Sequence, residues 1–305
     1  MAPRYAVPLA EVGLDDVAVV GGKSGHLGDL LQAGFPVPPG FAVTTEAQGG
    51  DGVEEELARA YAELGRAVGV DDPPVAVRSS AIAEDLPDAS FAGVQDTYLW
   101  IRGAAAVTEA VRRCWASFHN PEAVAYRREH GITRGGMGVA VQQMVDARVA
   151  GVMFTLNPLT GDPSSVAVEA SYGLGSAVVA GEVNPDSFVL SKVTGEVRQQ
   201  TLGAKALECV PDEASGGTVM QPVEEERRAR WALDDEELAR LVDLARRVER
   251  HYGRHQDLEW AIDGRLGSIS LLQARPETVW SQKPKEGSPS TDTISAIAAT
   301  FLPKR

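Results

Sequence analysis

The spacing of apolar residues predicts two long amphipathic helices. In residues 53–68 and again in residues 233–252, apolar side chains recur three and four positions apart, which places them on one face of an α-helix. Asp234, with Glu237 three positions later, predicts a capping box at the start of the second helix, and Gly253 predicts its end. Further helices are expected at residues 24–33 and within residues 104–130, where Asn120-Pro121 would break the pattern.

Alternation of apolar and polar residues predicts a pair of strands between His251 and Pro276. In residues 256–262 the odd-numbered positions, including Glu259, share one face, and the even-numbered positions share the other. A turn is expected at Asp263-Gly264, after which the period of two resumes at odd-numbered positions 269–275. The alternation fits either an edge hairpin whose polar face meets water or a hairpin whose polar face carries a site.

Shorter apolar runs predict the remaining strands. They lie at residues 17–20, 75–80, 97–101, 138–145, 149–156, 164–170, 187–193 and 196–202. The short link Asp146-Ala147-Arg148 suggests that the strands on either side of it form an antiparallel pair. Residues 211–221 are expected to form a flexible excursion, and the segment after Trp280, rich in Lys, Pro, Ser and Thr, is expected to be loosely held.

Composition and charge indicate a soluble globular protein. The chain has 305 residues, of which 44% are hydrophobic and 24% charged. Its formal net charge of -14 argues against nucleic acid or an anionic membrane as a general partner. No apolar run approaches the roughly 18 residues of a membrane span, and no secretory signal is apparent, so a cytoplasmic location is expected. Cys114 and Cys209 lack metal-ligand spacing and do not indicate a disulfide framework.

Two basic residues are candidates for binding phosphate. Lys23 stands at the entry to a predicted helix, where backbone N–H groups attract anions. The segment is not a P-loop, because Val17 occupies the position that requires a glycine. Arg78 ends a predicted strand near a loop of small residues, as a phosphate clamp would. The alternatives are a surface lysine in a glycine turn and an arginine paired with Glu84 or Asp85.

The predicted hairpin brings together candidate ligands for a metal. Glu259 and Gln273 offer hard oxygen atoms of the kind that Mg²⁺ prefers. Arg275 adds a fixed cation beside them. Together these groups are what a bound triphosphate and its metal require.

Five segments, taken in order, resemble the nucleotide-binding domain of the phosphoenolpyruvate synthase and pyruvate phosphate dikinase family. They are GGKSGHLGDLLQAGFPVPPGFAVTTEA, VAVRSSAIAEDLPDASFAGVQDT, VQQMVDARVAGVMFTLNPLTG, YGLGSAVVAGEVNPDSF and HYGRHQDLEWAIDGRLGSISLLQARPETV. The resemblance implies an α+β ATP-grasp fold with two lobes of mainly antiparallel sheet flanked by helices. The expected divisions are an N-terminal lobe at 1–143, a C-terminal lobe at 144–282 and a flexible tail at 283–305.

The resemblance also implies roles for individual residues. Lys23, Arg78 and Arg275 correspond to cationic phosphate ligands, and the loop with Gly93 would cover the phosphates. Glu259 and Gln273 correspond to positions associated with Mg²⁺. The full set expected to bind ATP is Lys23, Arg78, Gly93, Thr97, Gln142, Met144, Val145, Glu259, Gln273 and Arg275.

The sequence departs from the family pattern at three places. Family members continue into a swivelling domain with a phosphorylated histidine and a substrate domain, whereas this chain ends soon after the fifth segment. Ser176 stands where the family usually has glutamate, and the region between the first two segments is shorter than usual.

The expected function is therefore that of an ATP-binding, Mg²⁺-dependent component of a split dikinase. It would transfer a phosphoryl or pyrophosphoryl group to a histidine on a separate swivel-domain protein that serves a small-molecule acceptor. Two alternatives remain open from the sequence: a nucleotide-binding regulatory subunit without turnover, and a direct ATP-dependent kinase or ligase acting on a small molecule.

Overall fold

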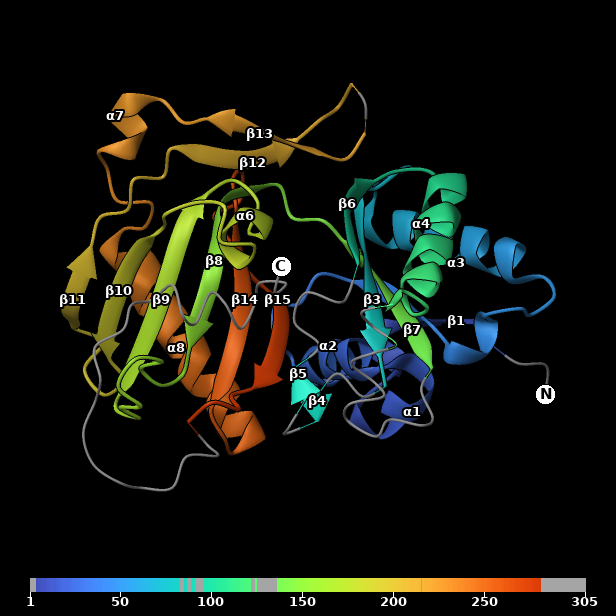
Figure 1. Ribbon diagram of the computed structural model, residues 1–305, viewed down its shortest axis with the longest axis horizontal. Helices are drawn as coiled ribbons and strands as arrows, with labels where there is room; N and C mark the ends of the chain where they lie inside the picture. The colour runs from blue at the N-terminus through green and yellow to red at the C-terminus, as the bar shows by residue number, and fades with distance from the viewer. Residues whose placement is uncertain are drawn as a thin grey trace. The chain divides into compact units, whose positions relative to one another are not determined.

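The chain forms two units, each built on its own sheet (Figure 1). In this computed structural model the described residues are 4–82, 85, 86, 89, 90, 96–121, 124, 136–214 and 216–280. Unit 1 comprises Met1–Met144 with Pro211–Thr218, and unit 2 comprises Val145–Val210 with Val219–Arg305. The sheets are antiparallel and flanked by helices, which confirms the α+β class. The lobe boundaries expected from sequence stay a prediction, and the expected tail lies outside the described residues.

Unit 1 contains a five-stranded sheet in the order β1-β2-β7-β3-β6. Its main apolar core lies between one face of this sheet and helices α3 and α4. Helices α1 and α2 pack against β7 and β3. The strands are β1 (Ala6–Pro8), β2 (Gly40–Val43), β3 (Val75–Ala81), β6 (Thr97–Ile101) and β7 (Met137–Gln143), with a two-residue pair β4 (Asp85–Leu86) and β5 (Ala89–Ser90). The helices are η1 (Leu9–Glu11), η2 (Leu14–Asp16), α1 (Val17–Val20), α2 (Gly22–Gln32), η3 (Thr45–Ala47), α3 (Val53–Val68) and α4 (Ala104–Ser117).

Unit 2 contains a six-stranded sheet in the order β11-β10-β9-β8-β14-β15. Helix α8 crosses one face of this sheet (Figure 1), and the short helix α6 packs against β8 and β9. The strands are β8 (Ala147–Phe154), β9 (Ser165–Tyr172), β10 (Asp186–Ser191), β11 (Val197–Thr201), β14 (Gln256–Asp263) and β15 (Ile269–Pro276). The helices are α6 (Ser176–Val179), α7 (Glu225–Arg228) and α8 (Asp235–Tyr252), and a separate hairpin consists of β12 (Leu207–Pro211) and β13 (Thr218–Pro222).

The prediction for α8 is confirmed at its N-terminus. The Asp234 carboxylate accepts a hydrogen bond from the Glu237 backbone N–H at 2.8 Å, and the Glu237 carboxylate accepts one from the Asp234 N–H at 3.1 Å. Gly253 closes the helix in the left-handed conformation with φ 65°. Helix α3 also occupies the predicted residues. Both helices were predictable because capping and apolar spacing act within the element itself.

The apolar run 17–20 is a helical turn, so the prediction of a strand there is wrong. Val20 is buried, whereas Val19 is 41% exposed. The run is too short for its periodicity to distinguish a strand from a helix. Gly21, with φ 80°, then separates α1 from α2.

Two predictions about the middle of the chain are also wrong. Strands β7 and β8 do not pair, because β7 lies in the sheet of unit 1 and β8 in the sheet of unit 2. Alternation fixes which face of a strand is apolar but not which strand it will pair with. The residues expected to form a flexible excursion instead contribute to the β12–β13 hairpin.

The paired strands β14 and β15 are confirmed, with one change in register. Glu259 lies opposite Gln273, but the next residue, Trp260, lies opposite Leu271. The resulting irregularity at Leu272 breaks the period of two in β15. Leu271 therefore shares the buried face with Trp260, whereas Gln273 shares the face of Glu259.

No helix among the described residues is long and apolar enough to span a membrane. Cys114 and Cys209 are both buried free thiols.

Candidate functional site

Lys23 is positioned by the start of α2. Lys23 is only 7% exposed, and the neighbouring Ser24 is fully buried. The Ser24 backbone N–H donates to the Ser80 hydroxyl at 3.1 Å. Because Ser80 belongs to β3, this bond fixes the first turn of α2, and with it Lys23, on the strand that carries Arg78.

Arg78, Thr97 and Gln142 lie on one face of the unit 1 sheet. Arg78 on β3 is opposite Thr97 on β6, and Gln142 on β7 is opposite Ala76 on β3. Residues directly opposite each other point to the same face, as do residues two apart on one strand. The apolar core lies on the other face, with Val75 and Val77. Three predicted ligands are thus on the same side of the sheet as Ser80 and the start of α2.

The residues predicted to bind the adenine lie on or just after β7. Gln142 is buried, and its side-chain amide donates to the Pro38 carbonyl at 3.4 Å. Met144 ends unit 1 and Val145 begins unit 2. The Met144 N–H donates to the Pro74 carbonyl at 2.9 Å. Gly93 lies outside the described residues.

The predicted metal ligands are direct neighbours in unit 2. Glu259 on β14 and Gln273 on β15 form a cross-strand pair, so their side chains emerge from the same face about 5 Å apart at the base. One pair further along the same face are Asp257 and Arg275. The structure therefore brings Glu259, Gln273 and Arg275 together, as the sequence predicted.

Asp257 orients Arg275. The Arg275 guanidinium lies 3.3 Å from the Asp257 carboxylate, and both side chains are largely buried. Burial raises the pKa of Asp257 to about 6, and Arg275 opposes this shift. An arginine held in this way keeps its fork in a defined direction, which suits a phosphate or carboxylate oxygen as a further partner.

Comparison with known proteins gives the family. The model of the pyruvate phosphate dikinase AMP/ATP-binding domain matches residues 48–295. The chain belongs to this family. It is 40% identical over 354 residues to a probable phosphoenolpyruvate synthase of Staphylothermus marinus, with 93% of this chain and 42% of the relative covered. It is 40% identical over 316 residues to a rifampicin phosphotransferase of Streptomyces sviceus, with 90% of this chain and 36% of the relative covered.

The matches agree with the resemblance to the dikinase family seen in the sequence. The chain spans less than half the length of these relatives. Among solved structures, D-alanyl-alanine synthetase A of Vibrio cholerae aligns with 81% of this chain and 52% of its own, at 12% identity and a TM-score of 0.36. In keeping with its family, this chain is an ATP-binding domain of the dikinase type.

The donor set on the dikinase-type domain fits Mg²⁺. No group of three or more His, Cys, Asp or Glu side chains in the described part of the chain could hold a metal by itself. Mg²⁺ in nucleotide sites is usually held by one or two carboxylates together with the phosphates of the nucleotide. The Glu259 carboxylate and the Gln273 amide oxygen, side by side on one face, meet that smaller requirement.

Glu169 is a site candidate that sequence reasoning missed. In the sheet of unit 2, Glu169 pairs with Val152, and Val152 pairs with Glu259. Glu169 therefore lies in the same row and on the same face as Glu259, two strands away. Burial raises the pKa of Glu169 to about 7. Its position in an alternating strand was visible in the sequence, but the pairing order that places it in this row was not.

Replacing Glu169 with glutamine is expected to stabilise unit 2 at alkaline pH. Because the folded pKa of about 7 exceeds the ordinary value of 4.5, the native state binds the proton more tightly than the unfolded chain. The resulting penalty is absent well below pH 4.5, grows between pH 4.5 and 7, and is complete above pH 7. Glu169→Gln should therefore gain about 2 to 3 kcal/mol at pH 8 and little at pH 4 in chemical denaturation. The exposed Glu182→Gln is the control, and an equal gain at both pH values would contradict the assignment.

Proposed function

We propose that this chain is the nucleotide-binding component of a dikinase-type phosphotransferase. It would bind Mg-ATP and transfer a phosphoryl or pyrophosphoryl group to a histidine of a separate protein, which would pass it to a small acceptor. The observation that carries the proposal is the pairing of Glu259 with Gln273 beside the oriented Arg275, in a chain of this family. The relatives extend beyond the part that this chain matches, and that further part is where a histidine acceptor would be sought.

The proposed chemistry requires positioning and charge rather than covalent participation by the chain. Phosphoryl transfer depends mainly on alignment and on stabilisation of phosphate charge. Lys23, Arg78 and Arg275 would bind phosphate oxygens, while Glu259 and Gln273 would hold Mg²⁺. The metal, when bound, would offset the negative charge on the phosphates. Asp257 would keep the Arg275 guanidinium in place during transfer.

Transfer of a labelled group tests the function directly. The full chain is incubated with Mg²⁺ and ATP labelled at the β or γ phosphate, together with the part of the Staphylothermus marinus relative that lies outside the match. Label in that protein, with AMP formed, would support pyrophosphoryl transfer, and γ label alone would support phosphoryl transfer. ADP accumulation without labelled protein, across this and other histidine-domain partners, would defeat the proposal.

The two alternative functions predict different results in the same assay. A direct kinase or ligase would produce ADP that depends on a small acceptor and not on a protein partner. A regulatory subunit would bind ATP without hydrolysis or exchange, including in Ser176→Glu.

Arg275→Ala is expected to weaken ATP binding by about 1 to 3 kcal/mol or more, because it removes a charge-assisted contact. This corresponds to roughly 5- to 150-fold in Kd, which titration calorimetry with Mg-ATP can measure. Arg265→Ala is the matched control, since Arg265 is exposed in the turn between β14 and β15. Thermal denaturation must accompany the measurement, because the change leaves the Asp257 carboxyl without its ion-pair partner. Unchanged affinity would exclude Arg275 from the site.

A further inference from the structure

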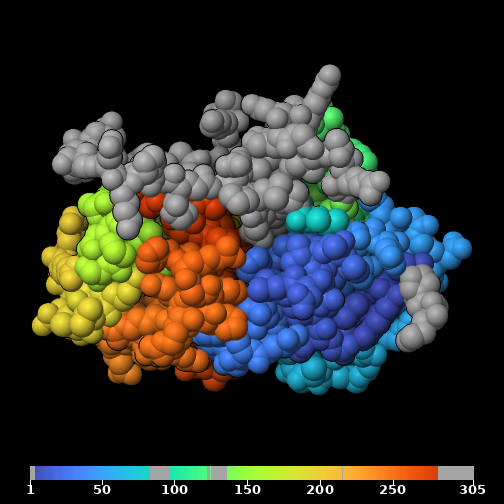
Figure 2. All heavy atoms as spheres, turned by 90° about the horizontal axis from the view of Figure 1, so that it is seen from below, coloured from blue at the N-terminus to red at the C-terminus, as the bar shows by residue number. Residues whose placement is uncertain are grey.

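Unit 2 contains a basic pocket of about 530 Å³. It lies where the C-terminal end of α8 meets the turn after β10 and the start of β14. The orange atoms of the α8–β14 segment border the yellow atoms of the β10–β12 segment on the surface (Figure 2). The charged and titratable lining residues are Lys192, Arg246, Glu249, Arg250, Arg254 and His255. Four formal positive charges thus face one negative charge, in a chain whose net charge is -14.

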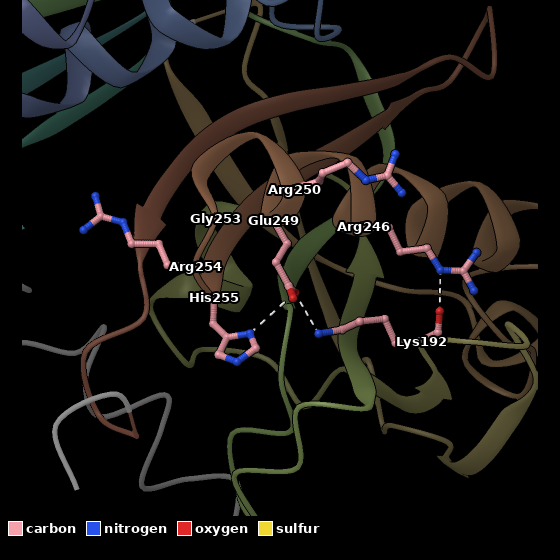
Figure 3. Close-up of a pocket in the computed structure, with 7 residues that line it drawn as sticks. All are labelled: Lys192, Arg246, Glu249, Arg250, Gly253, Arg254 and His255. Carbon is pink, nitrogen blue, oxygen red and sulfur yellow. Dashed lines mark hydrogen bonds and ion pairs between the residues drawn. The ribbon is translucent and has the colours of Figure 1, made fainter.

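The inner part of the basic pocket is fixed by contacts within the protein (Figure 3). The Lys192 ammonium donates to the Glu249 carboxylate at 2.7 Å, and His255 Nδ1 lies 3.5 Å from the same carboxylate. Arg246 donates to the backbone carbonyls of Lys192 and Val193. The single carboxylate of the pocket is therefore already shared by two basic groups, which leaves the outer cations uncompensated.

Arg250 and Arg254 form the outer part of the basic pocket. Both are exposed, and neither guanidinium group has a hydrogen bond or ion pair with any described residue. In Figure 3 their side chains extend on opposite sides, away from Glu249. Elsewhere on α8, Arg240 donates to the Gly267 carbonyl at 3.0 Å, so arginines of this helix do find partners in the protein.

The dipole of α8 explains only some of the positive charge in the basic pocket. Cations near a helix C-terminus gain typically 0.3 to 1 kcal/mol from the macrodipole, and Arg250 lies in the last turn of α8. The dipole explains neither Arg254, which follows the Gly253 cap, nor the presence of a pocket lined by both arginines. Concentration of one sign of charge around a pocket instead raises the local concentration of ions of opposite sign.

We propose that the basic pocket binds a small anion that carries two phosphate-type groups. Guanidinium forks match phosphate oxygens in two-point contacts, and the pocket is lined by two exposed ones, those of Arg250 and Arg254. Lys192 and Arg246 add positive charge below them. The volume of about 530 Å³ exceeds what one phosphate group needs. The pocket shares no residue with the proposed nucleotide ligands, so the inference goes beyond the proposed function.

Calorimetry on the full chain tests the proposal with methylenediphosphonate, a diphosphonate that cannot be hydrolysed. The titrations are made with saturating Mg-ATP, so that the proposed nucleotide site is occupied. Saturable binding is expected in the wild type, weaker by at least tenfold in the double variant Arg250→Ala and Arg254→Ala. Arg265→Ala, which changes an exposed arginine outside the pocket, should bind as the wild type does. Inorganic phosphate, with one anionic group, should bind at least tenfold more weakly than the diphosphonate.

The inference would be overturned by no saturable binding, by equal affinity in the double variant, or by equal affinity for phosphate and diphosphonate. Tighter binding of succinate would also overturn it, since a dicarboxylate would then be the preferred class. The outcome is distinct from that for the proposed function, because ATP binding in the absence of the diphosphonate is measured separately in each variant. The double variant should bind ATP as the wild type does.

Discussion

Asp186→Ala is expected to destabilise unit 2 by about 3 to 5 kcal/mol, because it leaves a buried ammonium group unpaired. Asp186 and Lys205 form an ion pair in which both side chains are fully buried. The Asp186 carboxylate also accepts hydrogen bonds from the backbone N–H groups of Gly203 at 2.8 Å and Ala232 at 2.7 Å. Removal of the carboxylate therefore leaves the Lys205 ammonium without its ion-pair partner and two backbone N–H groups without their acceptor. All three groups are buried.

Equilibrium denaturation of the full chain measures this loss. Arg198→Ala provides the matched control in the same unit, since Arg198 pairs with Asp162 at the surface at 3.2 Å, with side chains 45% and 38% exposed. Exposed pairs of this kind contribute about 0 to 1 kcal/mol. If Asp186→Ala cost no more than Arg198→Ala, the buried pair would not stabilise unit 2 more than an exposed pair does.

Gly21→Ala is expected to destabilise unit 1 by about 3 kcal/mol or more and to weaken ATP binding. Gly21 has φ 80°, and a Cβ atom there would lie 1.9 Å from the Ser80 backbone oxygen. The side chain cannot be accommodated unless α2 moves away from β3. Since Lys23 follows two residues later in the first turn of α2, the same movement would displace the proposed phosphate ligand.

Gly34→Ala separates the effect of backbone strain from that of the clash with Ser80. Gly34 also has positive φ, at 77°, but a Cβ there would meet nothing within 4 Å. Its replacement should cost only the backbone strain, about 1 to 2 kcal/mol, and should leave ATP affinity unchanged. Equal losses of stability in the two variants, or full ATP affinity in Gly21→Ala, would contradict the role assigned to the contact between Gly21 and Ser80.

The candidate site was predictable where its residues lie close together in the sequence. Glu259, Gln273 and Arg275 belong to two strands joined by a short turn, so alternation alone brought them near one another. The irregularity at Leu272 was not predictable, because it depends on how Trp260 and Leu271 fill the buried face of the sheet. For unit 1, the sequence identified Lys23 and Arg78 as separate candidates but did not place them together. The hydrogen bond between Ser24 and Ser80 holds their two segments side by side.

The sequence by itself determined α3, α8 and the β14–β15 pair, since apolar spacing, helix capping and turn residues act over a few neighbouring positions. The sequence also indicated the family, because five segments resemble those of the family in the same order along the chain. The tertiary structure alone decided that residues 17–20 are helical, that β7 and β8 belong to different sheets, and that Glu169 shares a row with Glu259. These outcomes depend on burial against residues distant in the chain, and local patterns contain no information about such partners.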